Sequence, residues 1–223
     1  EKRRNRLKKQ LRTIDEAKIE DEALGEIQTV LESGGSARSV ELSDHARKLI
    51  KPLGLLTAKP VIYATNVSEE DLAKGNKYCD ELIQLASSEG AEVIKVSAQV
   101  ESELIDLGEA ERVDYLESLG ISEGGLNSLI KATYRLLGLR TYFTTGEKET
   151  RAWTIQAGMT ASQAAGVIHT DFERGFIRAQ TIGYEKLLEA GSMVEARNKG
   201  WLRSEGKEYL VNEGDVIEFL FNV

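Results

Sequence analysis

Two short apolar runs rich in β-branched residues place the strongest constraint on the fold of this 223-residue chain. The first covers residues 60–65 and the second residues 91–96, and a helical pattern over residues 76–89 lies between them. Gly90 follows that pattern as the expected carboxyl-terminal cap of the helix. A strand, a helix and a second strand in this order favour a right-handed crossover in a parallel sheet. The sequence therefore predicts an α/β fold in which both strands end at the same edge.

Polar residues follow both predicted strands at that edge. Asn66 follows the first strand with Glu69 three positions later, and Ser97 and Ala98 follow the second. In P-loop nucleotide-binding domains an Asn-x-x-acid segment hydrogen-bonds a purine base, and a Ser-Ala loop packs its backbone against the same base at the carboxyl ends of the strands. Either segment alone is weak evidence, because strands often end in Asn or Ser for reasons of turn geometry. The two in order predict a base-binding site that includes Asn66, Glu69, Ser97 and Ala98.

Glu69 stands where guanine-specific proteins of this class carry Asp. The Asp carboxylate accepts hydrogen bonds from the N1–H and the exocyclic amine of guanine, and the extra methylene of Glu displaces that carboxylate. A site built for one hydrogen-bond pattern loses its discrimination when the pattern is spoiled. The sequence therefore predicts that ATP is preferred over GTP.

The phosphate-binding motif Gly-x-x-x-x-Gly-Lys-Ser/Thr occurs nowhere in the sequence, and Gly34-Gly35-Ser36 lacks the required Lys. The chain also begins without Met, inside a charged helical run. We therefore expect the carboxyl-terminal part of a longer protein. ATP and Mg²⁺ are expected as ligands of the intact protein, with neither held by this chain alone, and hydrolysis by this chain alone is not expected.

The composition is that of an ordinary globular chain, with 41% hydrophobic and 30% charged residues. The single cysteine, Cys79, excludes an intrachain disulfide. No apolar run approaches the roughly 18 residues that a membrane span requires. We expect a cytoplasmic protein with neither a membrane nor DNA as its partner.

Residues 1–33 carry two helical stripes of apolar residues. The stripes consist of Leu7, Leu11 and Ile14, followed by Leu24, Ile27 and Leu31. They fall out of phase across residues 15–21, which predicts two antiparallel helices with the tip of the hairpin there. Ser43 is the expected cap of a further short helix that ends at residue 49 or 50. The first 50 residues are thus predicted to form a helical coiled-coil arm.

Basic residues crowd the start of this arm. They are Lys2, Arg3, Arg4, Arg6, Lys8, Lys9 and Arg12, and the only acid among the first 12 residues is Glu1. Two interpretations are open at this point. The basic run contacts the phosphates of RNA, or it is a solvated helical face whose charges pair with acids on a neighbouring helix.

Residues 139–223 change to short strand-like runs around one helix. The expected strands cover residues 141–144, 153–155, 176–181, 208–211 and 216–221. The helix covers residues 161–168, with Thr160 as its expected cap. Strands that flank a single helix in a segment of this length predict a β-grasp, ubiquitin-like module.

Six runs of this sequence resemble those of the Obg-like ATPases of the YchF type, which are P-loop GTPase-like proteins. The runs are residues 66–69 (NVSE), 97–98 (SA), 139–144 (LRTYFT), 151–155 (RAWTI), 168–179 (IHTDFERGFIRA) and 215–223 (DVIEFLFNV). The resemblance implies a partial P-loop nucleotide-binding domain over residues 51–138, a coiled-coil arm inserted within it over residues 1–50, and a TGS domain over residues 139–223. It also implies a protein that binds and hydrolyses ATP and that binds ribosomes through RNA of the large or small subunit.

By position in the family's pattern, Asn66 would bind the adenine edge and Val67 would contact the base through its backbone. Glu69 would replace the guanine-reading Asp, and Ser97 and Ala98 would form the rear wall. Two alternatives stay open. One is a non-catalytic module in which the arm and the TGS domain dock on RNA or protein, and the other is a structural α/β domain in which Asn66 and Ser97 only cap turns.

Overall fold

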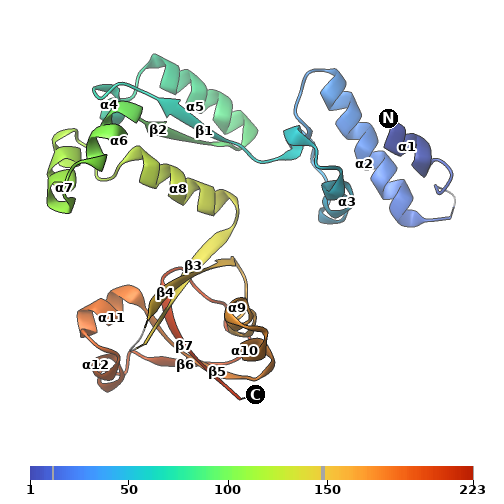
Figure 1. The fold of residues 1–223 in the computed structure, drawn as a ribbon. Coiled ribbons are helices and arrows are strands. Elements are labelled where there is room, and N and C mark those ends of the chain that lie inside the picture. The colour runs from blue at the N-terminus through green and yellow to red at the C-terminus, as the bar shows by residue number, and fades with distance from the viewer. Residues whose placement is uncertain (12, 147–148, 223) are drawn as a thin grey trace. The chain divides into compact units, whose positions relative to one another are not determined.

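The structure is a computed structural model that describes residues 1–11, 13–146 and 149–222. Arg12, one of the basic residues singled out above, lies outside these ranges. The chain divides into two compact units, residues 1–129 and 130–223, which are described separately (Figure 1). No helix within the described ranges is long and apolar enough to cross a membrane.

The first unit contains the predicted strand–helix–strand element. Strands β1 (Ile62–Asn66) and β2 (Glu92–Val96) pair in parallel, with Ile62 opposite Glu92 and Asn66 opposite Val96. Helix α5 (Lys77–Glu89) connects them, and Gly90 caps it in the left-handed conformation with a φ of 66°. These three elements and their parallel pairing confirm the prediction.

Four further helices complete the α/β part of this unit. They are α4 (Asp71–Lys74), α6 (Ala98–Ile105), α7 (Glu109–Ser118) and α8 (Gly125–Leu136), the last of which continues past residue 129 into the second unit. Leu72 of α4, Val100 and Leu104 of α6, and Leu116 of α7 form a core between these three helices. A Cβ on Gly125 would lie 2.8 Å from the Lys95 carbonyl oxygen, so glycine allows the start of α8 to pack directly on β2.

The arm consists of α1 (Lys2–Leu7), α2 (Asp15–Glu32) and α3 (Asp44–Ile50), with short 3₁₀ turns η1 (Ala37–Ser39), η2 (Lys51–Leu53) and η3 (Leu56–Ala58). Leu7, Leu24, Ile27 and Ile50 lie in its core. Ser43 caps α3 as predicted, because its hydroxyl accepts a hydrogen bond from the Ala46 amide.

The predicted position of the hairpin tip was wrong. Helix α2 begins at Asp15, inside the expected tip, and Ile14 precedes it in an extended conformation. Asp15 and Glu16 occupy the first turn, where carboxylates interact favourably with the helix dipole. The α1 helix ends at Leu7, so Leu11 and Ile14 do not continue its apolar stripe.

The second unit is built on a five-stranded mixed sheet. Its strands are β3 (Leu139–Thr145), β4 (Thr150–Gln156), β5 (Phe176–Gly183), β6 (Arg203–Glu205) and β7 (Asp215–Phe221). The strand order is β4-β3-β7-β5-β6, in which only the β3–β7 pair is parallel among the described strands. The sequence predicted all of these strands except β6.

Each face of this sheet has its own core. Tyr142 and Ile217 pack with α9 (Ala161–Ile168), and α10 (Thr170–Arg174) follows that helix along the chain. Phe143 and Val216, which point to the opposite face, pack with residues of α11 (Tyr184–Ala190) and α12 (Met193–Asn198). Burial raises the pKa of Tyr142, whose hydroxyl donates a hydrogen bond to the Ala164 carbonyl at 2.9 Å.

The strand predicted for residues 208–211 is absent from this described part of the chain. The backbone of this segment instead forms hydrogen bonds with residues at the start of α9. The Tyr209 carbonyl accepts a hydrogen bond from the Ala161 amide at 2.7 Å, and the Val211 amide donates to the Met159 carbonyl at 3.1 Å. Only an isolated bridge between Thr160 and Leu210 remains of the expected pairing.

We predict that Thr160→Ala lowers the free energy of unfolding by about 1 kcal/mol, because Thr160 and Gln163 form a reciprocal capping box at the start of α9. Urea denaturation followed by circular dichroism measures the change. Thr160→Ser keeps the hydroxyl and is expected to retain most of the stability. Equal losses in both variants would contradict the capping role and point to the methyl group.

Candidate nucleotide-base site

One hydrogen bond joins the two segments that the sequence selected for base binding. The Ala98 amide donates to Asn66 Oδ1 at 3.0 Å, although the two residues are 32 positions apart in the sequence. The strand pairing continues past β1, because the Val67 amide donates to the Val96 carbonyl at 2.8 Å. Asn66 and Ala98 therefore lie together at the carboxyl edge of the two parallel strands.

This bond orients the amide of Asn66. The Ala98 amide is a donor, so it requires the oxygen of the Asn66 side chain and leaves the two Nδ2 hydrogens. The Asn66 side chain is exposed, and Nδ2 has no partner among the described residues. The edge thus offers a fixed hydrogen-bond donor to a ligand.

Ser97 is buried and does not offer its side chain to a ligand. Its hydroxyl accepts a hydrogen bond from the Val100 amide at 3.5 Å and caps α6. Ala98, the first residue of that helix, is exposed. Ser97 therefore contributes to the candidate site by holding the backbone of Ala98 in place.

The backbone of the loop after Asn66 is also held in place. The Glu69 carbonyl accepts a hydrogen bond from the Leu72 amide at 3.2 Å, and Lys95 Nζ donates to the Ala73 carbonyl at 3.0 Å. Val67 is half-buried against the core around Leu72, which leaves its backbone rather than its side chain at the edge. Glu69 is exposed, so its carboxylate is accessible from solvent.

Sequence reasoning missed a polar network that lies near Glu69. Tyr115 of α7 donates a hydrogen bond to the Glu103 carboxylate, and Gln99 donates to the same carboxylate at 3.1 Å. The hydrogen bond to Glu103 raises the pKa of Tyr115 to about 12, with a smaller contribution from the Glu69 charge. No sequence motif identifies these residues, because Tyr115 belongs to α7 and Glu103 to α6, and only the packing of the two helices brings them together.

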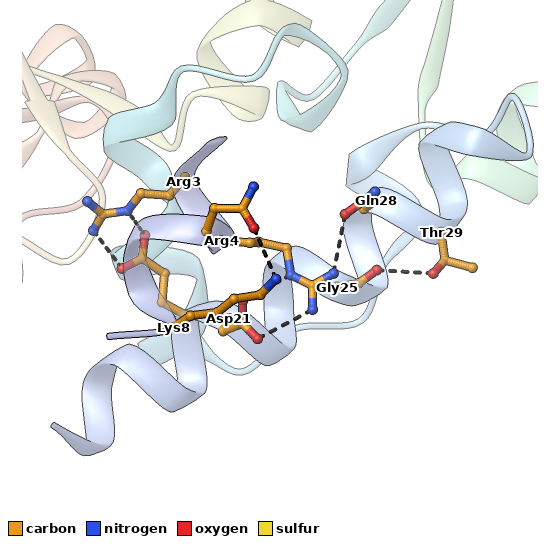
Figure 2. A network of polar contacts seen from close by, with 9 residues as sticks. Arg3, Arg4, Lys8, Asp21, Gly25, Gln28 and Thr29 are labelled. Atoms are coloured by element: carbon orange, nitrogen blue, oxygen red, sulfur yellow. Dashed lines mark hydrogen bonds and ion pairs between the residues drawn. The ribbon is translucent and has the colours of Figure 1, made fainter. Parts of the chain in front are cut away.

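Two residues of the basic run pair with acids of α2. Arg3 donates two hydrogen bonds to the Glu20 carboxylate at 2.6 and 2.8 Å, and Arg4 donates to Asp21 at 2.9 and 3.3 Å (Figure 2). Arg4 also donates to Gln28 Oε1, and Lys8 donates to Asn5 Oδ1. For Arg3 and Arg4 the structure therefore agrees with pairing to a neighbouring helix. Arg6 and Lys9 are exposed.

Comparisons with known proteins relate this chain to YchF-type proteins. The family model YchF-GTPase_C, described as a protein of unknown function (DUF933), matches residues 139–222. The ribosome-binding ATPase YchF of Bacillus subtilis (strain 168) is 51% identical over 226 residues, which cover 100% of this chain and 62% of the relative. The protein of the same name from Haemophilus ducreyi is 48% identical, with 98% of this chain and 60% of the relative covered.

A solved structure supports the same relationship. The Schizosaccharomyces pombe YchF GTPase is 35% identical, with a TM-score of 0.77 over 92% of this chain and 55% of that chain. The fold is therefore the mixed α/β fold of YchF GTPase structures. The chain belongs to the YchF-type family, and it spans about three fifths of the length of the curated relatives that it matches.

We predict that Tyr115→Phe raises the pKa of Glu103 towards the ordinary value of a glutamate, because the hydrogen bond from Tyr115 is the largest cause of its lowered pKa. Gln99→Ala, which removes the second cause, is expected to give a smaller rise. Carbon-13 NMR of the side-chain carboxylates measures both.

The sign of the pH dependence follows from the lowered pKa. The stability that the Tyr115–Glu103 contact confers is complete above the ordinary pKa of a glutamate and is lost as the pH falls through the lowered value. The difference in unfolding free energy between the wild type and Tyr115→Phe should narrow over that range. An unchanged Glu103 pKa in Tyr115→Phe would contradict the assignment.

Proposed function

We propose that this chain forms the purine-base end of an ATP-binding site in a ribosome-associated P-loop protein that hydrolyses ATP. The hydrogen bond between the Ala98 amide and Asn66 Oδ1 carries the proposal. It fixes a side-chain donor at the carboxyl edge of two parallel strands, where ligands of α/β sheets bind. The name of the curated relatives, ribosome-binding ATPase, supports the proposed activity and the ribosome as the partner.

Two observations favour adenine over guanine in this site. At position 6 guanine carries an acceptor oxygen, whereas adenine carries an amino donor. The Ala98 amide is already donated to Asn66 and is not available to a guanine oxygen. The extra methylene of Glu69 displaces its carboxylate from the position at which Asp accepts hydrogen bonds from the N1–H and the exocyclic amine of guanine, so the pattern that favours guanine is spoiled.

The remaining parts of the nucleotide are assigned to residues outside this sequence. The sequence holds no P-loop, so the longer protein would bind the phosphates and Mg²⁺, whose charge would stabilise the transferring phosphoryl group. Among the described residues no three His, Cys, Asp or Glu side chains are grouped to hold a metal ion. In this proposal Asn66, Val67 and Glu69 hold the base edge, and Ser97 and Ala98 hold its rear wall.

We further propose the domain division inferred from the sequence: a coiled-coil arm over residues 1–50, part of the nucleotide-binding domain over residues 51–138, and a TGS domain over residues 139–223. The mixed sheet with parallel β3 and β7 and with α9 packed on one face supports a β-grasp fold for the last segment. Binding to ribosomes in turn supports a cytoplasmic location.

A second candidate function is a non-catalytic module that binds RNA or protein. Two cation–aromatic pairs of the second unit favour it. The Arg151 guanidinium lies 4.3 Å from the Trp153 ring centre, and Lys199 Nζ lies 4.5 Å from that of Trp201. Such pairs present both a positive charge and a stacking surface to nucleic acid.

We predict that Glu69→Asp in the longer protein lowers the ratio of ATP to GTP affinity by about tenfold or more. A hydrogen bond to a charged group contributes about 1.5–3 kcal/mol, and Asp regains the acceptor geometry for guanine. Fluorescent nucleotide titration measures both affinities. Glu70→Asp is the matched control and should leave the ratio unchanged, and an unchanged ratio in Glu69→Asp would assign the selectivity to other groups.

We also predict which residues of the arm contact RNA. Arg6→Glu with Lys9→Glu should weaken ribosome binding and make its logarithmic salt dependence shallower by about one unit per lost phosphate contact. Arg3→Ala with Arg4→Ala should instead loosen the arm with little change in slope, because both side chains are paired with acids of α2. Cosedimentation with ribosomes across a salt series tests this prediction. Equal salt slopes for the wild type and for the Arg6→Glu, Lys9→Glu variant would contradict phosphate contact and leave the basic run as a solvated helical face.

A further inference from the structure

A groove of about 350 Å³ lies between α6, α7 and α8 in the first unit. Leu104 and Leu116 are buried and form its floor. Its walls carry Ile105, Val113 and Leu126, whose exposed fractions are 72%, 52% and 52%. These apolar side chains take no part in the candidate base site or in the core of the arm.

Three contacts hold the walls of this groove together. The Leu126 amide donates to Glu101 Oε1 at 3.1 Å, which joins α8 to α6. Arg112 Nη2 donates to the Ile105 carbonyl at 3.2 Å, and Tyr115 donates to Glu103, which join α7 to α6. The groove is thus formed in the unliganded chain, so a partner would not bear the cost of assembling it.

The charge around the groove is one-sided. Residues 101–127 contain eight Asp and Glu residues against a single Arg, Arg112. Glu101, Glu109 and Glu123 line the groove itself, together with Arg112. Carboxylates in this density repel the phosphates of RNA and attract a cationic partner.

We propose that this groove is the docking site for a basic amphipathic helix of a protein partner. Helices that bind in grooves insert apolar side chains spaced at i, i+3 or i+4 and i+7. Such side chains would cover Ile105, Val113 and Leu126, and Lys or Arg residues flanking the apolar stripe would face Glu109 and Glu123. A small molecule fits less well, because ligand pockets enclose most of their ligand, whereas the side chains of these walls are more than half exposed.

The test uses a defined probe on the 223-residue chain. The probe is a fluorescently labelled 18-residue peptide of Leu and Lys with one apolar helical face, followed by fluorescence anisotropy. A Leu–Glu peptide of the same pattern and a Leu–Lys peptide of scrambled order are the matched probes. The double variant Ile105→Gln, Val113→Gln removes apolar walls without changing charge, and Leu188→Gln with Val194→Gln alters similarly exposed residues of the second unit.

We expect the patterned Leu–Lys peptide to bind at least about tenfold more tightly than either matched probe, because binding in the groove requires both an apolar helical face and a positive charge. The groove variant should weaken this binding by about tenfold or more, since two apolar contacts are lost, and the control variant should stay within about twofold. Excess single-stranded RNA should not displace the peptide. Circular dichroism of both variants should match that of the wild type.

Four results would overturn the proposal. Equal binding of the scrambled peptide would show attraction by charge alone, and unchanged affinity of the groove variant would place the peptide elsewhere. A dimer seen by sedimentation velocity that the groove variant abolishes would make the occupant a second copy of the chain. Loss of peptide binding in the longer protein that contains this chain would mean that its own remaining residues cover the groove.

Discussion

The parallel pairing of β1 with β2 is the constraint on which the proposed base site depends. Its register places Asn66 opposite Val96, and the chain needs only two further residues to bring the Ala98 amide to Asn66 Oδ1. A shift of register by one residue would turn Asn66 to the other face of the sheet and break this bond. The cap that Ser97 provides to α6 and the close approach of Gly125 both rely on the same strand ends.

The arm is tied to the same element through a charged contact at its base. Arg38 of η1 donates to the Glu89 carboxylate at 2.8 Å, and the Tyr63 hydroxyl donates to the same oxygen at 2.8 Å. Both bonds hold the pKa of Glu89 below its usual value. Tyr63 lies in β1, three residues before Asn66, so this strand is linked to the base of the arm through Glu89 and also carries Asn66 of the proposed site.

The charge of the first unit is divided between surfaces with different uses. In the arm, the acids of α2 neutralise Arg3 and Arg4, whereas Arg6 and Lys9 are exposed. Around α6 and α7 the acids have few basic neighbours in the sequence and border an apolar groove. The same chain therefore presents a weakly basic arm and a strongly acidic helical face, for which we propose RNA and a cationic protein segment as the respective partners.

The sequence by itself determined the elements that have strong local signals. Periodicity and caps located β1, β2, α5 and α9, and the order of strand, helix and strand was enough to place Asn66 and Ala98 at one edge. The tertiary structure alone decided what local patterns leave open. Residues 208–211 look like a strand but serve the start of α9, Asp15 begins a helix rather than a turn, and Arg3 finds Glu20 across a hairpin. Nor could the sequence reveal the Tyr115–Glu103 contact or the groove, because hydrogen bonds and exposed faces between helices depend on packing of residues that are distant along the chain.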